Sequence, residues 1–134
     1  MIDFAHGYAY YGGRYSNSPG IILKVRLSDF TKVAELRLNS DETQLNSAAI
    51  APAAGYAYFG TYTVPGYIVR VRLSDMTRIA ALTLPTGESY LTSAVTDLTH
   101  GYAYFSTNAS PSSIIKIDLG INTAYNSYLP LIAR

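Results

Sequence analysis

Apolar and polar residues alternate in short runs along this chain, and no stretch carries apolar residues at helical spacing over three turns. In the segment 67–73, valine and leucine at every second position share one side of an extended strand, and two arginines take the other side. Ser74–Thr77 then forms a turn, in which Asp75 is well placed to bond its own backbone. The pattern predicts an all-β fold of short strands.

The chain repeats itself three times. Gly-Tyr-Ala-Tyr occurs at residues 7–10, 55–58 and 101–104. A second landmark, Val-Arg-Leu-Ser-Asp at residues 25–29 and 71–75, has a weak third copy at 117–120, and 46 residues separate each copy from the next. A fixed period whose length changes fall in one loop, residues 15–19, indicates stacked supersecondary units.

Each period holds four short strands, which is typical of a blade of a β-propeller. We predict three blades of four antiparallel strands each, at residues 1–40, 41–88 and 89–134. The predicted strands are Met1–Phe4 (a stub), Gly7–Tyr15, Ile21–Leu27 and Lys32–Leu38 in blade one, and Leu45–Ala51, Tyr56–Tyr62, Tyr67–Leu73 and Arg78–Leu84 in blade two, while blade three runs from Leu91 through Tyr102 and Ile115 to a degraded strand near Ala124–Leu129. The competing interpretation is a plain sandwich or an open solenoid of twelve strands.

The repeat resembles bacterial propeller repeats of the YVTN and NHL-like type. The resemblance rests on the Gly-Tyr-Ala-Tyr strand followed by an Ile-x-Lys-Ile-Asp-Leu-like strand, here Ile114–Leu119, and it covers nearly the whole chain. The Trp-Asp dipeptide of WD40 repeats and the paired glycines of kelch repeats are both missing. The resemblance implies the fold and says little of the activity, because propellers host unrelated functions.

Three blades are too few to close a ring, since propellers have about four to eight. The two terminal blades would expose apolar faces, and head-to-tail association is the physical remedy. We therefore expect a homodimer that completes a six-bladed ring, with the apolar tail 129–134 packed at the junction. The alternative is that the chain is the C-terminal piece of a longer propeller protein.

The composition of the chain argues against several classes of binding site. The net charge is +1, which gives no global field to recruit nucleic acid or an anionic membrane, and no long apolar run could span a bilayer. There is no cysteine, and His6 and His100 fall at equivalent places in separate blades, where they cannot share a metal. We predict no cofactor, no metal site and no catalytic residues, and interpret both histidines as turn residues.

We interpret the repeated tyrosines and the repeated cations as structural residues. The six tyrosines of the Gly-Tyr-Ala-Tyr strands are expected to wedge against the adjacent blade, with the alanines allowing close approach on the other face. Five cations recur at matching positions of the third strand of each blade, and we expect them on solvated outer parts of the blades or with their stems over apolar neighbours. These cations are Lys24, Arg26, Arg70, Arg72 and Lys116.

The loops that vary between repeats are the candidate binding site. In a propeller the second–third and fourth–first strand loops emerge on one face, around the channel mouth, and such loops commonly carry recognition. Three acidic residues are expected to make this rim mildly acidic. The predicted ligand-binding residues are Arg14, Tyr15, Asp41, Glu42, Tyr62, Glu88, Tyr90 and Asn108.

We favour a non-catalytic half-propeller that binds a protein or small-molecule ligand, or scaffolds. The alternative is an enzyme, a propeller-type lyase or hydrolase, with its site at the channel mouth. The polar residues of the innermost strands are mostly Asn46, Ser47, Thr92 and Ser93, whose side chains are poorly suited to general acid–base catalysis. No secretory signal follows Met1, so we expect a cytoplasmic protein as written, and an extracellular one if the chain is a fragment.

Overall fold

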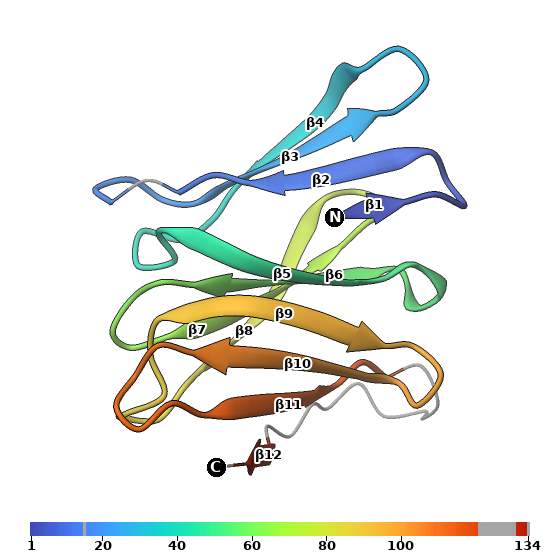
Figure 1. Cartoon of the computed structure of the whole chain (residues 1–134). Coiled ribbons are helices and arrows are strands. Elements are labelled where there is room, and N and C mark those ends of the chain that lie inside the picture. The colour runs from blue at the N-terminus through green and yellow to red at the C-terminus, as the bar shows by residue number, and fades with distance from the viewer. Residues whose placement is uncertain (15, 121–130, 134) are drawn as a thin grey trace.

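The computed structural model describes residues 1–14 and 16–120, and the backbone of residues 131–133. Within these residues the chain forms three antiparallel sheets of four strands each, which confirms the predicted all-β class (Figure 1). The strands are β1 Ile2–Asp3, β2 Tyr8–Gly12, β3 Ile21–Arg26 and β4 Thr31–Arg37; β5 Leu45–Ala51, β6 Tyr56–Thr61, β7 Tyr67–Arg72 and β8 Thr77–Thr83; and β9 Leu91–Asp97, β10 Tyr102–Thr107, β11 Ile114–Asp118 and β12 Leu131–Ala133. A 3₁₀ turn, η1 Pro52–Ala54, joins β5 to β6.

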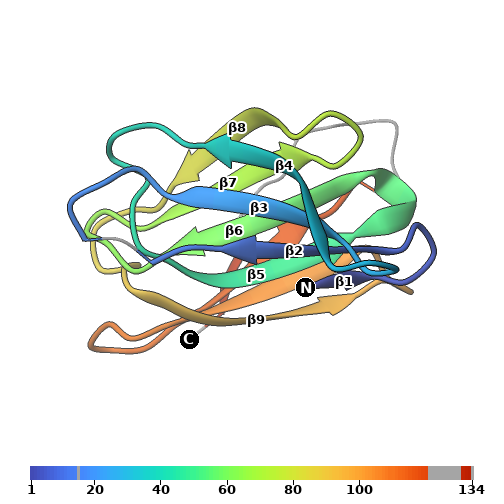
Figure 2. The same cartoon turned by 90° about the horizontal axis from the view of Figure 1, so that it is seen from above.

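The three sheets follow one another along the chain and stack face to face, and we call them blades one, two and three (Figures 1 and 2). Strand order within each sheet is the chain order, so each blade is a simple meander. The predicted outer strand of blade three, near 124–129, lies outside the described residues. Residues 131–133, which we had expected at an inter-chain junction, pair with β11 of their own blade through registers such as Lys116↔Leu131.

The hairpin between the third and fourth strands is built the same way in blades one and two. The carboxylates of Asp29 and Asp75 accept hydrogen bonds from the backbone N–H groups of Thr31 and Thr77, each at 3.2 Å. The intervening Phe30 and Met76 both adopt φ of 55°, in the left-handed region. The predicted Ser-Asp turn is therefore a repeated structural device.

The hydrophobic core consists of two layers, one between each pair of neighbouring blades. In the first layer, Tyr10 and Ile22 of blade one belong to the same buried cluster as Phe59 of blade two. In the second, Tyr58 and Ile68 occupy the corresponding positions in the cluster that blade two shares with blade three. Because successive side chains of a strand point to opposite faces, each blade buries both faces only when it has a neighbour on each side.

Candidate functional site

The loops expected to carry recognition gather at one end of the stack. The β2–β3, β6–β7 and β10–β11 hairpins lie at the left of Figure 1, together with the β4–β5 and β8–β9 connections. Four of the eight predicted site residues make contact there, and we call them the loop cluster: Arg14, Tyr62, Tyr90 and Asn108.

Tyr62 is the centre of the loop cluster. Its ring lies 4.9 Å from the ring of Tyr90, centroid to centroid, at a tilt of 48°. The guanidinium carbon of Arg14 lies 4.8 Å from the centroid of the same ring, a cation–π distance, and the side-chain amide of Asn108 donates to the Tyr62 hydroxyl at 3.2 Å. Aromatic faces, one cation and an amide thus converge on a single exposed patch.

The backbone of the repeat holds this patch in place. The N–H of Tyr62 donates to the carbonyl of Gln44 at 2.9 Å, and the N–H of Asn108 donates to the carbonyl of Tyr90 at 2.9 Å, the same bond one repeat later. Gln44 and Tyr90 both take positive φ, 51° and 59°, which an aromatic residue adopts only when its surroundings enforce it. The cluster therefore stands on a fixed scaffold.

The acidic residues do not form the expected rim. Glu42 and Glu88 are almost fully buried, with exposed fractions of 1% and 0%. Glu42 forms an ion pair with Arg78, whose Nε donates to Oε2 at 2.8 Å, and Ser113 donates to Glu88 at 3.3 Å. Asp41 is exposed, and both burial and this carboxylate raise the pKa of Tyr67. Tyr15 lies outside the described residues.

Three of the five third-strand cations lie over tyrosine rings. Lys24 lies 4.1 Å from the ring centroid of Tyr8, Arg70 3.7 Å from that of Tyr56, and Lys116 3.5 Å from that of Tyr102. The expected solvated position is wrong for Arg70, whose exposed fraction is 4%. The expectation failed because Arg70 lies at the junction between blades, which one strand's alternation does not reveal.

Lys24 and Tyr58 tie neighbouring blades together by polar contacts. The Lys24 ammonium donates to the carbonyl of Leu73 at 3.0 Å, from blade one to blade two. The Tyr58 hydroxyl donates to the carbonyl of Leu119 at 3.4 Å, from blade two to blade three. Leu73 and Leu119 are equivalent residues, 46 positions apart, so each junction places a donor on the same backbone carbonyl.

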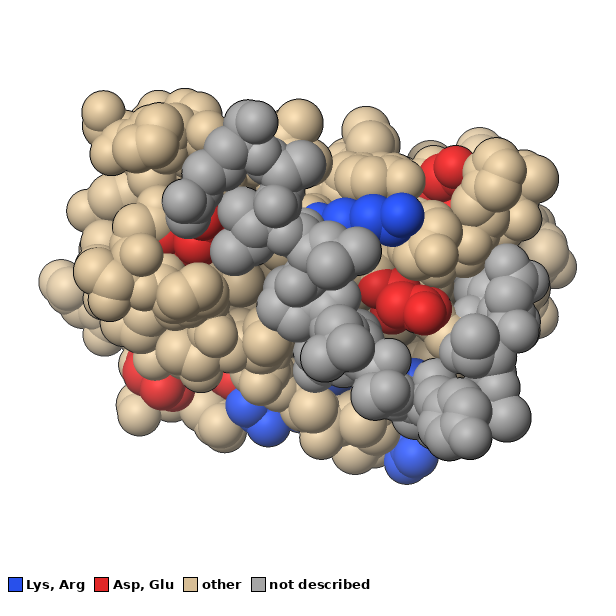
Figure 3. Space-filling view, turned by 90° about the horizontal axis from the view of Figure 1, so that it is seen from below, with Lys and Arg blue, Asp and Glu red and all other residues tan. Residues whose placement is uncertain are grey.

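Among the described residues, each terminal blade has large apolar side chains that are exposed where their equivalents are buried. Ile22 and Ile68 are fully buried between blades, whereas Ile114, their equivalent in blade three, is 50% exposed. On the other side, Met76 is 6% exposed but its blade-one equivalent Phe30 is 72% exposed. Seen from below, the described surface carries scattered charges among uncharged residues (Figure 3). Ile114 and Phe30 are thus exposed at positions that the internal junctions bury in the neighbouring repeats.

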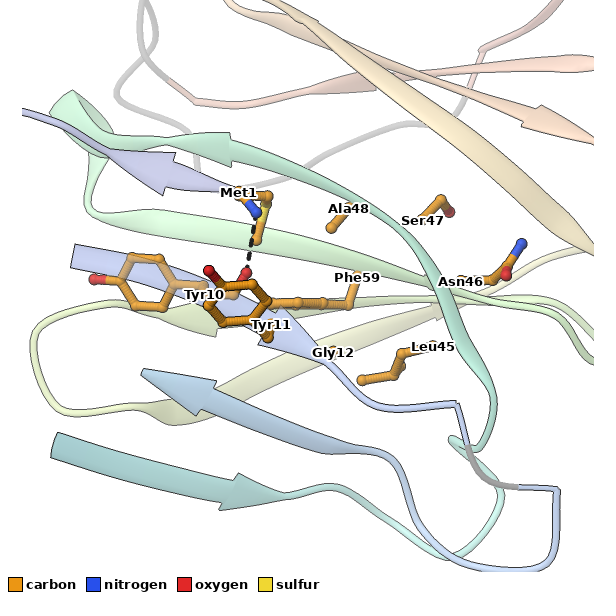
Figure 4. Close-up of a pocket in the computed structure, with 9 residues that line it drawn as sticks. All are labelled: Met1, Tyr10, Tyr11, Gly12, Leu45, Asn46, Ser47, Ala48 and Phe59. Carbon is orange, nitrogen blue, oxygen red and sulfur yellow. Dashed lines mark hydrogen bonds between the residues drawn. The ribbon is translucent and has the colours of Figure 1, made fainter. Parts of the chain in front are cut away.

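A pocket of about 200 Å³ lies where blade one meets blade two at their inner strands (Figure 4). Met1, Tyr11 and Gly12 line it from blade one, and Ala48 and Phe59 line it from blade two. Residues from Leu45 to Ser47 complete the wall, and Tyr10 contributes from β2. The N-terminal ammonium of Met1 donates to the carbonyl of Tyr10 at 3.0 Å beside this pocket.

Burial lowers the pKa of the Met1 amino group below its ordinary value of 8.0. The unfolded chain then holds more protons than the folded chain between the two pKa values, so the amine's contribution to stability rises with pH in that window. We expect the melting temperature to rise as the pH approaches about 8 more steeply in the free protein than in an N-terminally acetylated one. Differential scanning calorimetry of both forms tests this, and equal slopes would contradict it.

The histidines are turn residues, as predicted. His6 Nδ1 lies 2.8 Å from Asp3 Oδ2 in blade one. The equivalent contact in blade three joins His100 Nδ1 to Asp97 Oδ2 at 2.7 Å. Among the described residues, no three His, Cys, Asp or Glu side chains are grouped as a metal site would need. In the same part of the chain, no helix is long and apolar enough to cross a membrane.

Comparison with solved structures supports the propeller fold. The chain is similar to the crystal structure of the β-propeller domain of Cps50 (Swd1) from Myceliophteria thermophila, with a TM-score of 0.71 and 10% sequence identity. The match covers 100% of this chain and 38% of that one, so the chain spans well under half of the neighbour's length. No protein-family model matches the sequence. No curated protein matches it either. At this identity the likeness concerns the fold alone.

Proposed function

We propose that this chain is a non-catalytic β-propeller module that acts in binding or scaffolding and joins a second copy head to tail, so that six blades close a ring. One observation carries the proposal. Several large apolar side chains that are buried at an internal junction have an exposed equivalent on a terminal blade, as Ile114 and Phe30 illustrate. A heterologous contact of this kind closes when the rotation per subunit divides the circle, as it does for two half-rings.

The repeat predicts the contacts of the inter-chain junction. Lys116 and Tyr104 occupy the positions of Lys24 and Tyr10, which lie on the face that blade one turns toward blade two. Leu27 occupies the position of Leu73 and Leu119, whose carbonyls accept bonds across the internal junctions. In the proposed ring, blade three of one copy packs on blade one of the next, and Lys116 donates to the carbonyl of Leu27 of the second copy.

The loop cluster is the part of the proposed module that would contact a ligand. Two tyrosine rings, the Arg14 guanidinium and the Asn108 amide offer stacking, charge and hydrogen bonding within one patch. That combination suits a protein loop or a small molecule with a planar or apolar portion. We also assign the repeat to the YVTN and NHL-like type, on the Gly-Tyr-Ala-Tyr strands and on Ile114–Leu119.

Molar mass in solution tests the proposed ring. We expect light scattering coupled to gel filtration to give a single species at twice the chain mass of 14.6 kDa. The species should persist on dilution, because each junction buries two apolar blade faces. A compact monomer that stays soluble at high concentration would contradict the proposal. Polydisperse aggregates would contradict it too, and would favour a fragment of a longer propeller.

A further inference from the structure

A second pocket, which we call the junction pocket, lies between blades one and two and has a volume of about 230 Å³. The β1–β2 turn and η1 contribute to its wall and lie at the right of Figure 1, away from the hairpins of the loop cluster. Tyr8, Tyr10 and Lys24 of blade one line it, together with Pro52 and Leu73 of blade two. Because much of this wall is aromatic or aliphatic, the pocket suits a ligand with an apolar body.

The hydroxyl of Tyr10 is a buried donor without an acceptor among the described residues. Tyr10 is 2% exposed. Its equivalent in blade two, Tyr58, donates to the carbonyl of Leu119, whereas at the first junction the matching carbonyl, that of Leu73, is bonded by Lys24. Burial is the main cause that raises the pKa of Tyr10 to about 12, so the hydroxyl keeps its proton. An oxygen of a bound ligand would satisfy this donor.

Lys24 places a positive charge at the wall of the junction pocket. Its ammonium lies over the ring of Tyr8 and donates one of its three N–H groups to the carbonyl of Leu73 at 3.0 Å. None of the ion pairs among the described residues includes Lys24. The Asp3 carboxylate, which also lines the pocket, is bonded instead to His6, through the backbone N–H at 3.1 Å and through Nδ1 at 2.8 Å. The charge on Lys24 therefore favours an anionic group.

The polar residues of the junction pocket recur together in the repeat. Blade three has an aspartate, a histidine and a lysine at the same positions as blade one, whereas blade two has two alanines and an arginine there. The sets are Asp3, His6 and Lys24; Ala51, Ala54 and Arg70; and Asp97, His100 and Lys116. At the second junction the longer Arg70 is 4% exposed and lies over Tyr56. The three polar residues are thus present or absent as a group, which supports a shared role.

We propose that the junction pocket binds a small monocarboxylic acid whose body is a single apolar ring. The carboxylate would accept hydrogen bonds from the Lys24 ammonium and the Tyr10 hydroxyl, and the ring would pack against Leu73 and Pro52. An apolar cavity of about 150 Å³ holds a benzene molecule. The larger volume of the junction pocket leaves room for a carboxylate as well. The inference goes beyond the binding proposed for the loop cluster, and it does not depend on ring closure because the pocket lies within one chain.

Sodium benzoate is the probe, and the backbone amide resonances of the ¹⁵N-labelled protein report where it binds. We expect saturable shifts at Gly55 and Ser74, which line the junction pocket. Benzyl alcohol keeps the ring without the charge and should bind there at least about tenfold more weakly, a difference of about 1.4 kcal/mol. Equal affinity for the two probes would overturn the proposal. Shifts confined to Asn108 would support binding by the loop cluster and would overturn the present inference.

Two variants test the donors separately. Lys24→Met removes the charge and keeps most of the side-chain length, and it should weaken benzoate binding at Gly55 by about tenfold or more. Tyr10→Phe removes a hydroxyl that makes no bond to the described residues, so the variant should fold normally and bind benzoate about threefold more weakly or worse. Lys32→Met, at an exposed lysine of β4, is the matched control and should not change binding. Unchanged benzoate affinity in either pocket variant would overturn the proposal.

Discussion

Replacement of Glu42 by alanine is expected to lower the free energy of unfolding by about 2–4 kcal/mol. The carboxylate is buried and accepts bonds from Nε of Arg78 at 3.0 and 2.8 Å and from the backbone N–H of Asn39 at 3.1 Å. It joins the β4–β5 connection, which links blades one and two, to β8 of blade two. Its loss leaves the Asn39 N–H and part of the guanidinium without their acceptor.

Urea unfolding at fixed protein concentration measures the change, because association also contributes to stability. Glu35→Ala is the matched control, since Glu35 forms an exposed pair with Lys32 and its removal should change stability little. The double variant Glu42→Ala/Arg78→Met should be more stable than Glu42→Ala, because it also removes the cation left behind. If the Glu42→Ala protein had the same free energy of unfolding as the Glu35→Ala protein, the Glu42–Arg78 ion pair would not contribute to stability.

The all-β fold and its repeating sheets could be predicted from the sequence because the patterns that indicate them are local and periodic. Alternation along β7 and the recurrence of Gly-Tyr-Ala-Tyr are visible without knowing any long-range contact. The burial of Glu42 was not visible, because its partner Arg78 lies 36 residues away on the next blade. Arg70 was misjudged for a similar reason, since its burial comes from the stacking of blades. Periodicity predicts strands, whereas the charge environment of a residue depends on what packs across a junction.

The candidate site was predicted in part. Tyr62 and Asn108 stand at equivalent positions of successive loops, and Arg14 belongs to the loop with two extra residues, so repeat alignment was enough to select them. The contacts among them required the structure, because Tyr90 and Tyr62 lie 28 residues apart in the chain and their rings meet only when β6 and β9 are packed together. The pocket beside β1 was not predicted, although the short first strand was.

Ile114→Arg is expected to abolish the proposed dimer. Ile114 lies on the open face of blade three, at the position where Ile22 and Ile68 are fully buried. A guanidinium buried there without a partner should weaken association by about 100-fold or more, equivalent to about 2.7 kcal/mol. Ile79→Arg is the control, because Ile79 is a partly exposed isoleucine on the outer strand of blade two, 38% exposed and away from both open faces. Analytical ultracentrifugation should give a monomer for the first variant and a dimer for the second.

A mixing experiment separates a head-to-tail junction from any symmetric one. Tyr11→Arg damages the open face of blade one, where Tyr11 is 47% exposed, and alone should also give a monomer. In a mixture, the intact blade-three face of Tyr11→Arg chains can still pack on the intact blade-one face of Ile114→Arg chains, because a heterologous contact uses two different surfaces. One junction of the two then forms, so the mixture should contain a heterodimer weaker than the unmodified dimer. Failure of the mixture to associate, with both variants folded, would exclude this pairing of faces, since each chain would still present one undamaged half of it.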